Sequence, residues 1–435
     1  MMTQPKRVLV FAQKLGYQTR SFDAAARKLG VELAFVTDRC HQLDDPWGDR
    51  AIAVHFESPE VAAYTVLEAA RAGERVDGIL ALGDRPAVAA AYVARGLGLA
   101  HNHPLAVEAC RSKLRMREVF RDAGLRVPWF RAVALQPAPE PALLGISYPC
   151  VVKPLSLSAS TGVIRANNRE EFVGAAARVR RVLESPEILA SREANLDQMI
   201  VEGYIPGREV ALEGLLTDGA LRVLAIFDKA DPLEGPFFEE TIYVTPSRLS
   251  EEERKEIEKS AADAVRALGL SHGPVHAEFR INEEGVWPLE VAPRPIGGLC
   301  ARALRFVGGE SDEVIGLEEL LLRHAAEMPV GNWRREGAAS GVMMIPVPAS
   351  GVLESVEGEE SARAVAHIVG VEITARLHDY IAAWPEGTSY LGFLFARAET
   401  AEEVEGALRA AHGKLRFAIR ERLAVEHPGI RRMVG

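Results

Sequence analysis

The chain reads HAEFRINEEGVWPLEVAPR from His276 to Arg294, and this stretch decides the fold. Alternation along a first strand places His276, Glu278 and Arg280 on one face. Glu290 lies inside a second, apolar strand, where an ionised carboxylate is costly unless it is paired or bound to a metal. Two neighbouring strands that each offer one carboxylate, Glu278 and Glu290, predict an oxygen-ligand site for magnesium.

Arg294 follows directly after the second of these strands. A guanidinium at this position could bind the γ-phosphate of a nucleotide or an acyl phosphate with two parallel hydrogen bonds. The alternative is a structural salt bridge between Glu290 and Arg294. We favour the catalytic interpretation, because the two carboxylates and the arginine together suit phosphoryl transfer.

A lysine and a loop of small hydroxylated residues form a second candidate site. Lys153 ends an apolar strand and is followed by the sequence PLSLSASTGV over residues 154–163. Such a loop can surround phosphates with backbone N–H and side-chain O–H groups. The alternative is a surface turn with an exposed lysine. The predicted phosphate contacts are Lys153, Ser156, Ser158, Ser160, Thr161 and Gly162.

Two glutamates, Glu202 and Glu209, flank a tight turn at Pro206-Gly207. One acid could accept a hydrogen bond from the exocyclic amine of adenine, and the other could accept from the ribose hydroxyls. The backbone of Tyr204 and Ile205 could meet the adenine edge. The alternative is a pair of exposed glutamates at strand ends.

In this order, and with Ser112-Lys113-Leu114 before a helix, these segments resemble the ATP-grasp family. The resemblance covers roughly residues 5–330 and continues more weakly to the end. It implies ATP as the nucleotide, with magnesium, for which manganese can substitute. It also implies that Lys113 is the first nucleotide lysine, that Lys153 contacts the α-phosphate, and that the loop closes over the β- and γ-phosphates.

The order of apolar runs predicts an N-terminal parallel sheet. Runs at 7–11, 32–36, 51–54 and 78–82 alternate with helical patterns, which is typical of a parallel α/β domain. The resemblance adds a central two-lobed ATP-grasp domain, and the strands and helix near the end indicate a C-terminal α+β domain. The predicted boundaries are 1–105, 106–330 and 331–435, with a small lid subdomain at about 125–200 and a large subdomain at about 201–330.

Two more expectations concern the central region. A single helix is predicted from Leu105 to Ala123, because Gly124 and Pro128 follow it. The segments 198–204, 209–217 and 221–228 are predicted to be consecutive antiparallel strands, with a hairpin turn at residues 217–219 joining the last two.

Composition limits the classes of function. The 435 residues are 48% hydrophobic and 26% charged, with a net charge of −10, which argues against a nucleic-acid-binding protein. The apolar run at 8–12 is too short for a signal sequence or membrane span. Cys40, Cys110, Cys150 and Cys300 are far apart and are expected to be reduced thiols. We expect a cytoplasmic protein, possibly a homodimer, with small-molecule partners and without nucleic-acid or membrane partners.

The run from Pro293 to Gly298, and the pair Gly392-Phe393 before a helix, are similar to L-amino acid (dipeptide) ligases, in the carboxylate–amine ligase branch of the family. This resemblance implies an ADP-forming ligase that joins a carboxylate to an amine through an acyl phosphate, with Lys153 and Arg294 as catalytic residues. Other candidates for contacting the carboxylate and amine are Lys229, Glu239, Glu240, Gly297 and Gly298.

Two alternatives remain. The first is an enzyme similar to biotin carboxylase or to the purine-biosynthetic members, which activates bicarbonate or a small carboxylate. The second is a catalytically silent nucleotide-binding regulatory module. Ala292 supports the second, because many members of the family have a metal-binding Asn two residues after the second glutamate. The number of magnesium ions is therefore left open.

Overall fold

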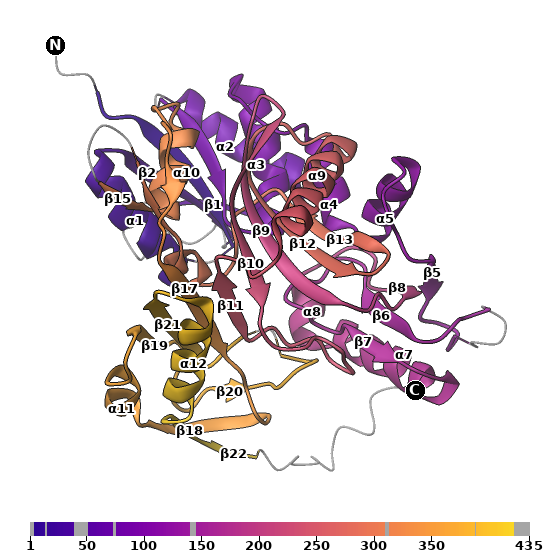
Figure 1. Cartoon of the computed structure of the whole chain (residues 1–435). Helices are drawn as coiled ribbons and strands as arrows, with labels where there is room; N and C mark the ends of the chain where they lie inside the picture. The colour runs from indigo at the N-terminus through magenta and orange to yellow at the C-terminus, as the bar shows by residue number, and fades with distance from the viewer. Residues whose placement is uncertain are drawn as a thin grey trace.

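The computed structural model describes residues 4–13, 15–38, 51–72, 75–139, 145–308, 313–387 and 389–421. It begins with a parallel sheet of order β3-β2-β1-β4 (Figure 1). The apolar run in β1 is almost fully buried, because helices cover both faces of the sheet. The elements are β1 (Arg7–Ala12), α1 (Tyr17–Leu29), β2 (Glu32–Asp38), β3 (Ile52–Val54), α2 (Pro59–Arg71), β4 (Gly78–Ala81) and α3 (Asp84–Leu97).

The helix predicted over residues 105–123 is two helices, α4 (Pro104–Arg111) and α5 (Lys113–Asp122). Ser112 separates them with an extended backbone, and its hydroxyl accepts a hydrogen bond from the backbone N–H of Arg115. The prediction of one helix was wrong because serine is a good helix N-cap and can begin a new helix within a continuous apolar pattern. The break places Lys113 in the first turn of α5.

A four-stranded antiparallel sheet, which we call the lid sheet, follows with the order β5-β8-β6-β7. The helix α7 packs on it, with apolar side chains buried in a shared core. The elements are β5 (Phe130–Ala134), β6 (Cys150–Pro154), β7 (Ile164–Ala166), α7 (Arg169–Leu183), α8 (Pro186–Ala190) and β8 (Gln198–Gly203).

The expected pairing of segment 198–204 with segment 209–217 was wrong. The strand β8 pairs with β5 and β6, whereas the next strand belongs to a different sheet. Gly207 explains the change of direction: its φ is +117°, and a Cβ atom there would lie 2.1 Å from the carbonyl oxygen of Ile281. The turn therefore leads the chain from the lid sheet into the central sheet.

The central sheet has eight strands in the order β13-β12-β9-β10-β11-β17-β21-β19. Alternation along β9 sends Val210, Leu212 and Leu216 to the core beneath α9, and Ala211 and Leu215 to the core on the other face. The elements are β9 (Arg208–Thr217), β10 (Ala220–Lys229), β11 (Ile242–Thr245), α9 (Glu251–Leu268), β12 (Gly273–Asn282), β13 (Gly285–Ala292), β17 (Ala339–Ile345), β19 (Ile368–Ile373) and β21 (Gly392–Ala398).

The C-terminal strands β17, β21 and β19 thus extend the same sheet as the strands that carry Glu278 and Glu290. The helix α12 (Ala401–His412) covers them, and a small sheet of order β20-β18-β22 lies beyond. The remaining elements here are β18 (Gly351–Glu357), α11 (Glu359–Arg363), β20 (Tyr380–Ile381) and β22 (Arg416–Arg420). The domain boundaries stated above remain predictions.

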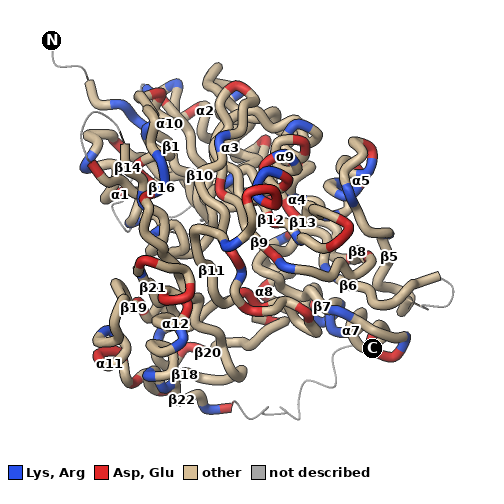
Figure 2. Tube along the Cα trace, viewed as in Figure 1, with Lys and Arg blue, Asp and Glu red and all other residues tan. Residues whose placement is uncertain are grey.

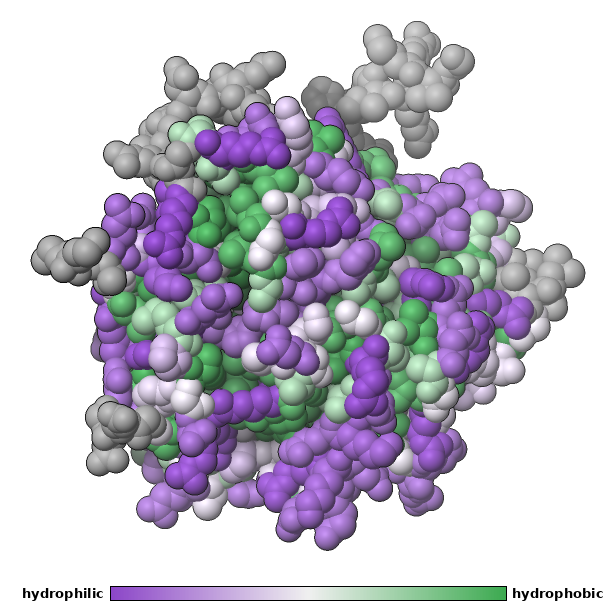
Figure 3. All heavy atoms as spheres, turned by 90° about the horizontal axis from the view of Figure 1, so that it is seen from above, coloured by the Kyte–Doolittle hydropathy of each residue, from purple (hydrophilic) through white to green (hydrophobic). Residues whose placement is uncertain are grey.

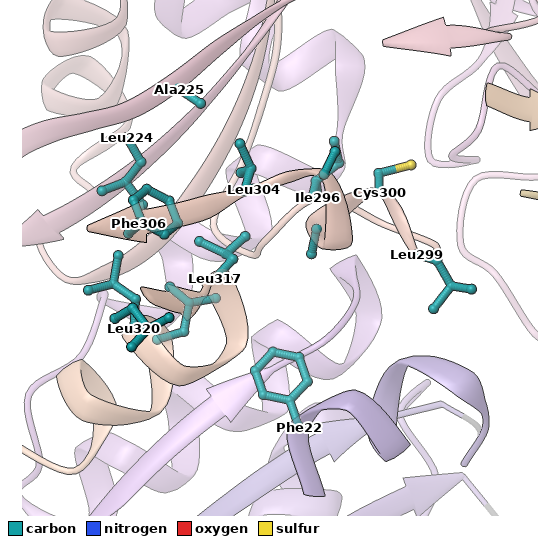
Figure 4. Close-up of a cluster of buried hydrophobic side chains, with 14 of the residues drawn as sticks. Phe22, Leu224, Ala225, Ile296, Leu299, Cys300, Leu304, Phe306, Leu317 and Leu320 are labelled. Carbon is teal, nitrogen blue, oxygen red and sulfur yellow. The ribbon is translucent and has the colours of Figure 1, made fainter. Parts of the chain in front are cut away.

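A short layer joins the N-terminal domain to the central sheet. It contains η1 (Cys300–Ala303), β14 (Arg305–Val307), β15 (Val314–Gly316), α10 (Leu317–Ala325) and β16 (Arg334–Arg335). Phe22 of α1 faces Leu317 and Leu320 of α10 across the interface, within one hydrophobic cluster (Figure 4). The sulfur of Cys300 points away from this group.

In the described part of the chain, acidic and basic residues are interspersed along the trace, and both kinds occur in every region (Figure 2). On the face seen in Figure 3, hydrophobic patches are bordered by hydrophilic residues. Among the described helices, none is long and apolar enough to cross a membrane. Cys110, Cys150 and Cys300 are buried free thiols, and Cys40 lies outside the described residues.

Candidate active site

A cavity of about 700 Å³ lies between the lid sheet, the central sheet, the end of β4 and the C-terminal region. Most of the predicted site residues line it, although they come from distant parts of the chain. They are Lys113, Lys153, Ser158, Ser160, Glu202, Tyr204, Ile205, Glu209, Glu240, Glu278, Glu290, Arg294, Gly297 and Gly298. Five predicted residues are outside its lining: Ser156, Thr161, Gly162, Lys229 and Glu239.

Glu278 and Glu290 are direct partners in the ladder between β12 and β13, and a bulge follows Glu278. Both carboxylates are partly buried and border the cavity. Lys113 has its Nζ atom 3.9 Å from the Glu290 carboxylate. Ala292 lies one strand period from Glu290, is buried, and faces His276 across the ladder.

Lys113 is a part of the site rather than a surface residue. Its ammonium donates a hydrogen bond at 2.6 Å to the backbone carbonyl of Leu157. Leu157 lies in the loop at residues 154–163, which we call the phosphate loop after its predicted role. Because the residue stands in the first turn of α5, the break at Ser112 aims it toward the loop and Glu290.

Glu202 forms a buried ion cluster with Lys153 and Arg117. Its carboxylate lies 2.5 Å from the Lys153 ammonium and accepts hydrogen bonds from Nε and Nη2 of Arg117 at 2.8 and 3.2 Å. Burial alone would raise the pKa of Glu202, but the two cations lower it to about 2. Burial also lowers the pKa of Lys153, despite the neighbouring carboxylate. Sequence reasoning missed Arg117, whose only signal is its place one helical turn after Lys113.

The phosphate loop, residues 154–163, presents only some of its hydroxyls to the cavity. Ser158 and Ser160 line it, whereas the hydroxyl of buried Thr161 donates to the carbonyl of Gly387 at 3.4 Å. Ala159 and Ser160 both have left-handed backbone conformations, with φ of 55° and 53°. Such conformations persist where surrounding contacts hold the chain.

Lys229 is surrounded by three carboxylates. Its Nζ atom lies 2.6 Å from Glu209, 2.5 Å from Glu240 and 3.0 Å from Glu278. Burial alone would lower the pKa of Lys229, but these acids raise it well above its usual value. Burial raises the pKa of Glu240 to about 7, even with the lysine beside it.

Arg280 continues this cluster toward the turn at residues 204–207. Its Nε atom donates to Glu209 at 2.8 Å, and its Nη1 atom donates to the carbonyl of Ile205 at 2.6 Å. The guanidinium also lies 5.2 Å from the centre of the Tyr204 ring. The backbone and acid that were predicted to meet adenosine are thus held by one arginine, which sequence reasoning had placed only on the face of Glu278.

Arg294 pairs with Asp84, at the start of α3, rather than serving only as a neighbour of Glu290. Its Nε atom donates to Asp84 at 2.9 Å, and Ser158 donates to the same carboxylate at 2.7 Å. Burial alone would raise the pKa of Asp84, but Arg294 and Ser158 lower it to about 2. Sequence reasoning missed Asp84, although an acid soon after the carboxyl end of a buried parallel strand is often part of a ligand site.

Aromatic side chains form part of the cavity wall. Tyr17 and Phe393 lie edge to face, with ring centres 5.9 Å apart, and Tyr390 lies 6.4 Å from Phe393. Glu240 accepts a hydrogen bond from the hydroxyl of Tyr243 at 2.7 Å, and its carboxylate lies within 4.8 Å of those of Glu209 and Glu278. Glu239 is outside the cavity lining: burial raises its pKa, and among the described residues one of its buried carboxylate oxygens has no hydrogen-bond partner.

His276 contacts two carboxylates, those of Glu213 and Glu278. Its Nδ1 atom lies 2.5 Å from Glu213, and its Nε2 atom lies 3.5 Å from Glu278. Burial alone would lower the pKa of His276, but Glu213 and Glu278 raise it to about 9. Glu213 also accepts a hydrogen bond from the backbone N–H of Ile296 at 3.1 Å, next to Arg294.

These residues fit a nucleotide and a divalent cation. Glu278 and Glu290 offer carboxylate oxygens, the ligands preferred by magnesium, from adjacent strands into one cavity. Lys113 and Lys153 offer positive charge to phosphates in the same cavity. The roles of the individual residues remain predictions.

Comparison with protein families gives two matches. Residues 146–303 match the ATP-grasp domain, and residues 343–420 match the L-amino acid ligase C-terminal domain 2. The predicted ATP-grasp architecture is therefore confirmed.

Individual proteins agree with this assignment. An alanine–anticapsin ligase of Bacillus subtilis (strain 168) is 29% identical over 252 residues, which cover 54% of this chain and 52% of that protein. A D-alanine–D-alanine ligase of Geobacter sulfurreducens is 28% identical over 242 residues, covering 54% and 70%. The chain spans about half the length of the curated relatives that match it first.

Among solved structures, an L-amino acid ligase from Bacillus licheniformis superposes with a TM-score of 0.78 at 26% identity. That superposition covers 97% of this chain and 100% of the other. The predicted resemblance is confirmed. The chain therefore contains an ATP-grasp domain, at residues 146–303, followed by an L-amino acid ligase C-terminal domain, at residues 343–420.

Proposed function

We propose that the protein is an ATP-dependent carboxylate–amine ligase that joins amino acids through an acyl phosphate and releases ADP and phosphate. The observation that carries the proposal is the shared cavity. It brings together the lysines Lys113 and Lys153, the metal-suited acids Glu278 and Glu290, and Arg294, and its wall also contains Glu240 and several aromatic side chains. The similarity to ligases of amino acids supports the same conclusion.

The reaction needs positioned charge more than covalent help from the protein. A carboxylate oxygen of the first substrate attacks the γ-phosphorus, and the bond to the ADP oxygen breaks. The amine of the second substrate then attacks the acyl carbon, loses a proton and displaces phosphate. Lys113, Lys153 and Arg294 are proposed to neutralise the phosphoryl oxygens during these steps. Glu278 and Glu290 would hold magnesium, or manganese in its place, which supplies further positive charge to the phosphates.

The remaining predicted contacts are assigned to adenosine, to its phosphates and to the amino-acid substrates. Glu202, Glu209, Tyr204 and Ile205 are proposed to lie around adenosine, and Ser158 and Ser160 around its phosphates. Glu240 is proposed to receive a substrate ammonium group, because it is an acid that lines the cavity beside Tyr243. Gly297 and Gly298 are proposed to leave room for the substrate beside Arg294.

A phosphate-release screen of amino acids, singly and in pairs, with ATP and magnesium tests this function. The productive pair should give ADP, phosphate and amide in equal amounts. Release of AMP and pyrophosphate would contradict the acyl-phosphate route. Phosphate release with bicarbonate, and without any amine, would favour the bicarbonate-activating alternative.

A further inference from the structure

A short C-terminal segment touches the phosphate loop at three places. We call this segment, residues 384–387, the clasp. The backbone N–H of Gly162 donates to the carbonyl of Pro385 at 3.0 Å. The indole Nε1 of Trp384 donates to the carbonyl of Ala159 at 3.2 Å. The hydroxyl of Thr161 donates to the clasp residue Gly387, as described above.

An ion pair joins the clasp to the lid at a fourth place. The guanidinium of Arg178, on α7, donates to both carboxylate oxygens of Glu386, at 2.6 and 2.8 Å. Bidentate geometry of this kind fixes orientation as well as distance. Their side chains are 33% and 42% exposed, so substitution at either position can be made without opening a core.

The loop that the clasp holds is strained. Ala159 and Ser160 are consecutive non-glycine residues with positive φ, a conformation that is costly unless neighbouring groups enforce it. The clasp makes hydrogen bonds to the first residue of this pair, Ala159, and to Gly162, two residues after the pair. The loop conformation that faces the cavity is thus supported by a different region of the chain.

The clasp also contacts the aromatic side chains that form part of the cavity wall. The Trp384 ring lies 4.9 Å from the ring of Tyr390, which lines the cavity and lies next to Phe393. Trp384 therefore stands between the phosphate loop on one side and the aromatic wall on the other.

We propose that the clasp is a positioning element that holds the phosphate loop over the cavity, so that the acyl phosphate reacts with the amine and not with water. In the wasteful reaction, water attacks the acyl carbon and the bond to the phosphate oxygen breaks, which returns the carboxylate and phosphate without amide. A closed loop prevents this by excluding water. The proposal rests on the proposed ligase function.

The experiment measures phosphate and amide together in the full-length protein. Trp384→Phe keeps an aromatic ring at this position but removes the indole N–H donor. Glu386→Gln weakens the ion pair with Arg178. Each should raise the phosphate released per amide by at least about threefold and raise the KM for ATP. The double variant with Arg178→Glu and Glu386→Arg should return the ratio toward that of the wild type, whereas either change alone should not. Arg180→Gln, on the same helix, is the matched control and should leave the ratio unchanged.

Hydrogen exchange of residues 155–166 gives a readout that is independent of turnover. The clasp variants should exchange faster in this segment, and the Arg180 variant should not. Unchanged exchange and an unchanged ratio would overturn the clasp proposal even if the ligase is active. If no amino-acid pair gives amide, the ligase function fails, and faster exchange in the variants would still show the clasp holding the loop.

Discussion

Asp84 accepts a hydrogen bond from Nε of Arg294 at 2.9 Å across 210 residues of sequence, and the same carboxylate accepts from Ser158. One residue at the start of α3 therefore holds both the predicted catalytic guanidinium and the phosphate loop. The N-terminal domain contributes to the geometry of the site through this contact.

Asp84→Asn should mainly lower kcat, by about 10- to 100-fold, because Arg294 loses the charge that orients it. The KM for ATP should change much less. Loss of one partner of a largely buried pair should also reduce stability by about 3 kcal/mol. Steady-state kinetics and thermal unfolding check both effects. Asp84→Glu keeps the charge, so it should recover part of kcat; equal kinetic loss in both variants would contradict a role in orienting Arg294.

Lys153→Ala should weaken ATP binding and turnover together, by roughly 2–4 kcal/mol in kcat/KM, if the ammonium neutralises phosphate. A lysine at the end of a strand is not core, so from the sequence one expects folding to be unaffected. The structure revises this expectation, because Lys153 balances the buried carboxylate of Glu202, and the thermal midpoint should fall as well. Lys255→Ala, at an exposed position on α9, should change neither quantity.

Glu290→Gln should abolish turnover, because it removes one of two carboxylates proposed to hold magnesium. A non-hydrolysable ATP analogue should still bind through the lysines, with a weaker dependence on magnesium concentration. Calorimetric titrations at several magnesium concentrations measure this. Glu284→Gln, in the turn between the same strands, is the control. Full activity of the Glu290 variant would reject the metal site.

His276 predicts a pH dependence of stability. Its pKa is about 9 in the folded protein, above its ordinary value of 6.5, because of Glu213 and Glu278 and in spite of burial. The contribution of protonated His276 to the free energy of unfolding is therefore complete below pH 6.5 and is lost as the pH rises to about 9. Thermal midpoints of the wild type and His276→Gln should differ most at pH 6 and converge above pH 9. A constant difference would contradict a charged His276–Glu213 pair.

The sequence was sufficient for the elements with strong local signals. The helices α2 (Pro59–Arg71) and α9 (Glu251–Leu268) have such signals, because proline or a serine cap marks their beginnings and apolar periodicity their lengths. The hairpin at residues 217–219 is also as predicted, since Asp218 and Gly219 both take the left-handed conformation that the turn needs.

Long-range partners could not be read from the sequence. Arg117 and Asp84 carry no motif, and their importance comes from facing Glu202 and Arg294 in the fold. Pairing between strands was missed for the same reason, because β8 has an apolar pattern that suits either sheet. Residue types limit what chemistry is available, whereas the fold decides which charges meet.

The continuity of the eight-stranded sheet limits how this protein can be divided. Residues 242–245 of β11 pair with residues 340–343 of β17, so a hydrogen-bonded ladder joins the ATP-grasp domain to the strand in which the C-terminal match begins. A chain truncated at residue 330 would expose the edge of β11 and part of the apolar face that α12 covers. Such a fragment is expected to aggregate, and swapping C-terminal regions between relatives would require the graft to match the strand register at this seam.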